Sequence, residues 1–200
     1  MSDLTMLRWF LAAFFTFVAV FYTCLVIYKK RHYQPVTTMG PAYSCHWWNH
    51  LTFRVFRAAI WLVCVWLVFS PTVFTYLVPF NALLIPQLMW SGAMFLVFGF
   101  IIAIAANFTL GDQWRSGIVQ NENHNLIKKG LYGISRNPGY IGVGVAQMGF
   151  FLALPSLFSL ICLLVGLFAL RKQALLEEQY LHNRYHEHYM HYRSLVPRWL

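Results

Sequence analysis

Charged side chains are scarce in this sequence, and acidic ones are the scarcest. Asp and Glu together number six among 200 residues, against fifteen Lys and Arg, while 59% of the residues are hydrophobic. A water-soluble domain needs more polar surface than this, so the composition indicates an integral membrane protein. The excess of basic residues is typical of loops that flank membrane spans. No nucleic-acid recognition motif accompanies it, so we expect no nucleic-acid partner.

Several common kinds of reactive site are also missing. The four cysteines form no CxxC pair and no disulfide framework, which argues against cysteine redox chemistry. Two histidine pairs have helical spacing, His46 with His50 and His182 with His186, but no third ligand follows at motif spacing, so no metal site is predicted. No Ser-His-Asp or Cys-His constellation can be assembled either.

Long apolar runs predict an all-α, polytopic membrane protein with about five transmembrane helices. The first run lacks a basic leader and a small-residue cleavage site, so we expect a retained span rather than a signal peptide. The last two helices form a hairpin that breaks at Pro155-Ser156. The predicted apolar segments cover about 7–28, 58–76, 83–108 and, for the hairpin, 139–170.

The distribution of basic residues predicts the orientation. The loop after the first span contains no acidic residue and carries Lys29, Lys30, Arg31, Arg54 and Arg57. By the positive-inside rule this loop is cytoplasmic, and the N-terminus lies on the other side. The hairpin then returns to the cytoplasm, where we expect a charged, amphipathic C-terminal helix.

The hairpin geometry predicts a long-range contact. Its two arms, 136–155 and 155–177, are about 28 and about 33 Å long at about 1.5 Å per residue. Arg136 and the adjacent acids Glu177 and Glu178 therefore return to nearly the same depth. Groups this far apart in sequence can meet in space at the cytoplasmic face.

The segment around Arg136 has two interpretations. Asn137 is a good N-cap and Pro138 suits the first helical position, so a helix N-terminus and a guanidinium would together favour an anion. Alternatively, Arg136 only anchors the span at the membrane surface. The glutamate pair is equally open, because adjacent helical residues diverge and either could face the protein, a ligand or water.

Two further patterns have structural explanations. Tyr185, Tyr189 and Tyr192 share one face of a helix and could form an aromatic belt at the membrane interface. The glycines at 142, 144 and 149 superficially resemble a dinucleotide-binding loop. Because they lie inside an apolar helix without a preceding strand, close helix packing is the better interpretation.

Taken together, the C-terminal half resembles the membrane methyltransferases that include isoprenylcysteine carboxyl methyltransferases and phospholipid N-methyltransferases. The resemblance covers about 110–198, and its parts are ordered and correctly spaced. Three positions depart from the family pattern, with Leu131 in place of Pro, Asn137 in place of His, and His186 in place of Gly. The matching motifs are His124-Asn125-Leu126-Ile127-Lys128-Lys129-Gly130-Leu131-Tyr132, Arg136-Asn137-Pro138-Gly139-Tyr140-Ile141-Gly142, Glu177-Glu178, and the tail from Tyr189 to Val196-Pro197-Arg198.

This resemblance implies S-adenosylmethionine as the methyl donor, bound at the cytoplasmic face in a pocket that the C-terminal helix closes. It divides the chain into an N-terminal three-helix membrane region, 1–108, and a cofactor-binding catalytic region, 109–200, within one integrated domain. The catalytic residues carried over are Arg136, Tyr140 and Glu177. The cofactor-binding residues carried over are His124, Leu126, Gly130, Tyr132, Arg136, Pro138, Tyr140, Glu177, Glu178 and Tyr189.

The resemblance also implies a lipophilic acceptor that enters from membrane lipid, such as a prenylcysteine-like carboxylate or a lipid amine. The expected location is a bacterial inner membrane or an endomembrane. Two alternatives stay open: an NADPH-dependent enzyme similar to sterol reductases, and a non-catalytic membrane scaffold or lipid-binding protein. No oligomeric state follows from the sequence.

Overall fold

The computed structural model describes residues 3–32, 42–111 and 126–200, and these parts of the chain are almost entirely helical. Among these residues, four helices are long and apolar enough to cross a membrane, namely α1, α2, α4 and α6, and the apolar helix α5 is shorter at 16 residues. The all-α, polytopic membrane fold is therefore confirmed. The elements are α1 (Asp3–His32), α2 (Cys45–Phe69), α3 (Val73–Tyr76), η1 (Asn81–Leu83), α4 (Pro86–Leu110), η3 (Gly130–Gly133), α5 (Pro138–Ala153) and α6 (Leu157–Leu195).

The bounds predicted for the second span were wrong at both ends. Helix α2 begins at Cys45 rather than near Ala58, because the Ser44 side chain caps it by accepting a hydrogen bond from the Trp47 backbone N–H at 3.1 Å. It ends at Phe69 rather than near Tyr76, where Pro71 interrupts the helix. Arg54 and Arg57 consequently lie on α2 and not in the preceding loop. Apolar runs alone miss such polar helical turns.

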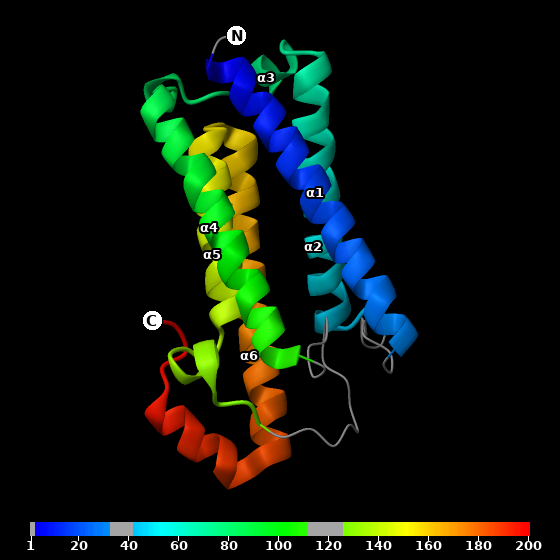
Figure 1. Cartoon of the computed structure of the whole chain (residues 1–200), viewed down its shortest axis with the longest axis vertical. Helices are drawn as coiled ribbons and strands as arrows, with labels where there is room; N and C mark the ends of the chain where they lie inside the picture. Colours follow the sequence, from blue (N-terminus) through cyan, green and yellow to red (C-terminus); the bar gives the residue numbers. More distant parts are fainter. Residues whose placement is uncertain (1–2, 33–41, 112–125) are drawn as a thin grey trace.

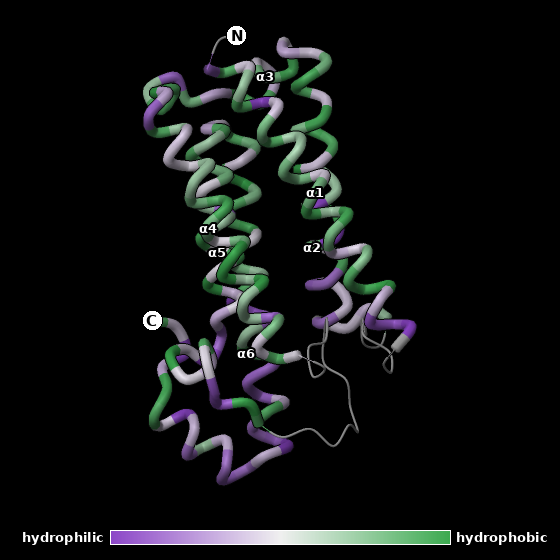
Figure 2. Tube along the Cα trace, viewed as in Figure 1, coloured by the Kyte–Doolittle hydropathy of each residue, from purple (hydrophilic) through white to green (hydrophobic). Residues whose placement is uncertain are grey.

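The helices form one elongated bundle, with α1 beside α2 and with α4 beside α5 and α6 (Figure 1). The hydrophobic core lies in the half of the bundle that contains the start of α1 and the turn between α5 and α6. There Leu11 of α1, Leu67 of α2, Leu96 of α4 and Phe150 of α5 pack together. The opposite end carries the hydrophilic residues of α6 and of the segment after it (Figure 2).

Helices α4 and α5 approach each other at glycines. A Cβ atom on Gly149 would lie 2.3 Å from the Leu96 backbone nitrogen, and one on Gly142 would lie 2.5 Å from the Ala103 nitrogen. Neither position has room for a side chain, so the two backbones are in direct contact. The interpretation as helix-packing residues is confirmed for Gly142 and Gly149, but not for Gly144, where a Cβ would make only an ordinary side-chain contact.

Helix α6 is longer than a membrane crossing requires. A crossing helix needs about 20 residues, whereas this helix has 39, so its polar part after Leu176 is not needed to span the membrane. At His186 the backbone adopts φ 43° and ψ −115°, and this kink turns the last residues back toward the start of α5 (Figure 1). The predicted continuation of the helix is confirmed, although it is not straight.

The kink changes the environment of the tyrosines. Tyr189 and Tyr192 are only 1% and 3% exposed, and together with Val196 they pack against Leu126 and Tyr185. An aromatic belt facing the membrane interface is therefore the wrong interpretation for Tyr189 and Tyr192. These side chains instead form a small second core beneath the end of the bundle.

Candidate functional site

Arg136 and Glu178 form an ion pair at the hydrophilic end of the bundle. Arg136 lies two residues before the first residue of α5, and its Nη1 lies 3.1 Å from Oε2 of Glu178 on α6. Both side chains are buried, at 8% and 9% exposed. The contact predicted from the lengths of the hairpin arms is therefore present.

Both oxygens of the Glu178 carboxylate are occupied by protein donors. Oε1 accepts from Asn137 Nδ2 at 3.1 Å and from Arg198 Nε at 2.9 Å. Oε2 accepts from Arg136 Nη1 and from Arg198 Nη2, each at 3.1 Å. Burial raises the pKa of Glu178, but the hydrogen bond from Arg198 and the charge of Arg136 outweigh it, and the pKa lies below its usual value. Glu178 thus faces the protein.

Asn137 begins α5 but does not cap it with its side chain. The amide group donates to Glu178 instead, and also to the carbonyl of Arg198 at 3.3 Å. A buried carboxylate requires hydrogen-bond donors, and an asparagine NH₂ group supplies two. The expected side-chain cap was wrong, whereas Pro138 does occupy the first turn of the helix.

The C-terminal tail is held against the start of α5 by main-chain contacts. The Arg136 N–H donates to the Pro197 carbonyl at 3.0 Å, and the Ser135 hydroxyl donates to the Arg198 carbonyl at 3.0 Å. Nearby, the Tyr192 hydroxyl donates to the Tyr132 carbonyl at 2.6 Å. The kink at His186 makes these contacts possible, because a straight helix would carry the tail away from the bundle.

Glu177 has a different environment from its neighbour. Its Oε1 accepts hydrogen bonds from the Tyr140 hydroxyl and from Gln173 Nε2, the latter at 3.1 Å. Burial raises the pKa of Glu177, and these two hydrogen bonds only partly offset it. Tyr132 lies close by: burial raises the pKa of its phenol, and the charge of Glu177 raises it further.

Two groups at this end of the bundle have unused hydrogen-bonding capacity. The Nε atom of Arg136 is buried and has no hydrogen-bond partner among the residues that the structure describes. Within the same described residues, Oε2 of Glu177 also accepts no hydrogen bond. A guanidinium donor and a carboxylate acceptor therefore each keep one hydrogen-bonding position that no described residue fills.

Most of the predicted site residues gather here, although not all of them can be placed. They form two hydrogen-bonded groups: Arg136 bonds to Tyr189 and to Glu178, and Tyr140 bonds to Glu177. Pro138 and Tyr132 lie beside these groups. Leu126 packs against the tyrosine core, and Gly130 adopts a positive φ of 60° beside Thr109. His124 lies outside the described residues.

Three participants were missed by sequence reasoning. Arg198 was within the matching tail motif, so the motif could have identified it. Gln173 lies one helical turn before Glu177, a spacing that predicts contact between the two side chains. Asn49 on α2 donates to Gln173 Oε1 at 3.0 Å, but it lies far away in sequence and no local pattern distinguishes it.

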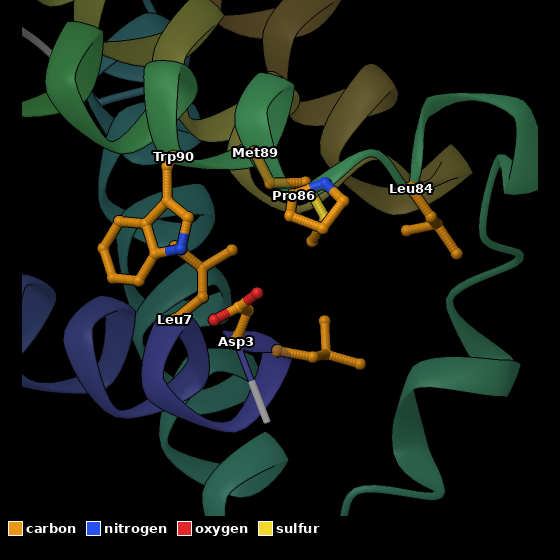
Figure 3. Close-up of a pocket in the computed structure, with 7 residues that line it drawn as sticks. Asp3, Leu7, Leu84, Pro86, Met89 and Trp90 are labelled. Atoms are coloured by element: carbon orange, nitrogen blue, oxygen red, sulfur yellow. The ribbon is translucent and has the colours of Figure 1, made fainter. Parts of the chain in front are cut away.

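A small apolar cavity lies at the other end of the bundle. It has a volume of about 120 Å³ and is bordered by Leu7, Met89 and Trp90, with Asp3 at its edge (Figure 3). Asp3 starts α1, whereas Arg136 and Glu178 lie where α5 begins and the apolar part of α6 has ended (Figure 1). The cavity is thus separate from the polar site.

The fold and the polar site define a class: a polytopic helical membrane protein with buried acid–base pairs at one end of its bundle. The family model described as phospholipid methyltransferase matches residues 88–188, and the chain belongs to this family. The match includes Arg136, Tyr140, Glu177 and Glu178 but neither Asn49 nor Arg198. No curated protein and no solved structure matches the chain. Membership in a methyltransferase family supports an enzyme that acts on lipid-like substrates, rather than a reductase or a scaffold.

Proposed function

We propose that this protein transfers a methyl group from S-adenosylmethionine to a lipophilic acceptor at the cytoplasmic face of a membrane. The observation that carries the proposal is the presence of one unused cationic donor, Arg136 Nε, and one unused anionic acceptor, Glu177 Oε2, at the same end of a helical membrane bundle. Membership in the phospholipid methyltransferase family supports the same reaction.

The available groups fit the chemistry of this methyl donor. S-adenosylmethionine carries a carboxylate, an ammonium group and ribose hydroxyls. Arg136 would hold the carboxylate, because a guanidinium binds carboxylates with geometric specificity. Glu177 would accept hydrogen bonds from the ammonium group or the ribose. Tyr132, Tyr140 and Tyr189 would border the bound molecule, with Leu126, Gly130 and Pro138 around it, and His124 stays a proposed cofactor-binding residue.

Glu178 would act indirectly. Its oxygens are already occupied by Arg136, Asn137 and Arg198. It therefore fixes the Arg136 guanidinium and the tail, and does not itself contact the donor. This separates the roles of two adjacent glutamates: Glu177 contacts the donor, and Glu178 holds the site together.

The bound donor supplies an electrophilic methyl group on a sulfonium. The protein's contribution is orientation, because in-line methyl transfer depends on holding donor and acceptor in line, which can lower the barrier by several kcal/mol. A carboxylate acceptor, such as that of a prenylcysteine, needs no general base. A lipid amine must lose a proton, and we assign no residue to that step.

The cytoplasmic orientation is supported by basic residues. Lys29, Lys30 and Arg31 lie at the end of α1 on the same side of the bundle as the polar site (Figure 1). The positive-inside rule places this end toward the cytoplasm, where S-adenosylmethionine is produced.

Isothermal titration of the detergent-solubilised protein with S-adenosylhomocysteine and with NADPH tests the proposal. We expect S-adenosylhomocysteine to bind, Arg136→Ala and Glu177→Ala to abolish this binding, and both variants to remain folded. Binding of NADPH alone, or wild-type affinity in both variants, would contradict the assignment. Transfer of a radiolabelled methyl group in native lipid extract, followed by identification of the product, would then reveal the acceptor.

A further inference from the structure

Two buried amide side chains connect the N-terminal helices to the polar site. Asn49 on α2 and Gln173 on α6 are only 5% and 3% exposed. Buried amides are costly unless they are hydrogen-bonded. Both amides belong to one continuous series of hydrogen bonds that ends at Glu177, and Asn49 also bonds to a backbone carbonyl.

The chain of hydrogen bonds has three links. Asn49 Nδ2 donates to Gln173 Oε1 at 3.0 Å, and Gln173 Nε2 donates to Glu177 Oε1 at 3.1 Å. The Tyr140 hydroxyl donates to the same oxygen of Glu177. Three helices, α2, α5 and α6, are joined in this way at the edge of the membrane.

The direction of the chain is set by a backbone carbonyl. Asn49 Nδ2 also lies 3.2 Å from the carbonyl oxygen of Ala169, which can only accept a hydrogen bond. The Asn49 NH₂ group must therefore face α6, where it meets the oxygen of Gln173. The Gln173 NH₂ group is consequently turned toward Glu177. This removes the usual ambiguity in the orientation of amide side chains.

This series of hydrogen bonds determines which oxygen of Glu177 lacks a partner. A glutamate has several rotatable bonds, and two donors on Oε1 restrict them. Oε2 is then left without a hydrogen-bond partner among the described residues. The titratable groups that face this carboxylate are Tyr140 from α5 and Tyr132 from η3.

We propose that Asn49 and Gln173 are positioning residues for methyl transfer: Asn49 orients Gln173, and Gln173 holds Glu177 with its Oε2 directed at the amino group or ribose of the methyl donor. This inference rests on the proposed function. It assigns a role to α2, which lies outside the part of the chain that matches the family.

The test uses variants that keep side-chain size but remove hydrogen bonds. Gln173→Met and Asn49→Leu are made singly and together in the full-length protein. Gln179→Met and Asn183→Leu, at exposed positions of α6, are the matched controls. Affinity for S-adenosylhomocysteine is measured by titration. The ionisation of Glu177 is followed by infrared difference spectroscopy without ligand, with Glu177→Gln used to identify its band.

We expect Gln173→Met to weaken S-adenosylhomocysteine binding about 10-fold or more, because a hydrogen bond to a charged group is lost. The midpoint of Glu177 ionisation should rise by about one pH unit, since a donor that favours the carboxylate is removed. Asn49→Leu should change both quantities in the same direction by a smaller amount. In the Gln173→Met background, Asn49→Leu should have no further effect, because Asn49 acts through Gln173.

Unchanged affinity and midpoint in Gln173→Met and Asn49→Leu would overturn the proposal, as would additive effects in the double variant. A merely structural role would lower thermal stability without moving the Glu177 midpoint. If the wild-type protein does not bind S-adenosylhomocysteine, the proposed function fails. In that case the infrared titration of the ligand-free protein still decides whether Asn49 and Gln173 control Glu177.

Discussion

Arg198 forms a two-pronged ion pair with Glu178, through Nε to Oε1 at 2.9 Å and through Nη2 to Oε2 at 3.1 Å. The same carboxylate also pairs with Arg136, whose Nη1 lies 3.1 Å from Oε2. A single buried acid therefore joins the start of α5, the polar part of α6 and the tail. Because Arg136 and Arg198 share this carboxylate, a substitution at Arg198 should also alter the position of the Arg136 guanidinium.

Replacing Arg198 by Lys should weaken its ion pair with Glu178. A lysine keeps the positive charge but cannot contact both carboxylate oxygens with a planar fork. Because Arg198 is partly exposed, we expect a modest loss of about 1–2 kcal/mol in the free energy of unfolding. Thermal unfolding in detergent measures it. Arg193→Lys, at an exposed position of the same segment, is the control and should be neutral.

The stability that the ion pairs of Glu178 contribute should also depend on pH. The pKa of Glu178 lies below its usual value in the folded protein. The unfolded chain therefore takes up the proton at higher pH than the folded one does. The stability that Glu178 contributes is present above its unfolded pKa of about 4.3 and is lost as the pH falls through the lower, folded pKa.

Glu178→Gln provides the measurement for this effect. The variant should be less stable than the wild type at pH 7, and the difference should shrink as the pH falls below about 5. The pKa of Glu177 is raised, so its effect on stability has the opposite pH dependence. Its contribution to the free energy of unfolding is greatest at low pH and is lost as the pH rises. Glu177 is present in both proteins, so its effect cancels in the comparison. A difference that does not vary with pH would contradict this account of the ion pairs.

His186→Gly should stabilise the protein. His186 has φ 43° and ψ −115°, a conformation that is strained for a residue with a Cβ atom but accessible to glycine. Relief of about 1–3 kcal/mol of strain should exceed the entropic cost of glycine, for a net gain of about 1 kcal/mol. His188→Gly, at an exposed helical position two residues later, should instead destabilise. If His186→Gly destabilised equally, the kink would not be strained.

Gly149→Ala should separate α4 from α5. The new methyl group would meet the Leu96 backbone, which cannot rotate away as a side chain could. We expect a loss of about 1–3 kcal/mol, typical of overpacking. Gly144→Ala is the matched control on the same helix, because its Cβ would lie 3.5 Å from a Leu167 methyl group, an ordinary contact. Circular dichroism during heating in detergent would compare the two variants.

Composition and apolar runs were sufficient to predict the class of fold. With 59% hydrophobic residues and long apolar segments, the chain can satisfy its backbone groups in lipid only as helices or a closed barrel, and the run lengths favour helices. The meeting of Arg136 with Glu178 was also predictable, since a hairpin with nearly equal arms returns to its starting depth. The bounds of α2 were not, because polar turns extend a helix without adding to an apolar run.

What the sequence by itself determined was the presence of a membrane helix bundle with basic and acidic groups at one end. Only the tertiary structure decided that Glu178 holds the tail while Glu177 keeps one oxygen available, because adjacent residues on a helix point in different directions and their neighbours come from other helices. The same holds for Asn49, whose contact with Gln173 joins residues 124 positions apart. The physical reason is that hydrogen bonds are short and directional, so packing of the helices determines which donor reaches which acceptor.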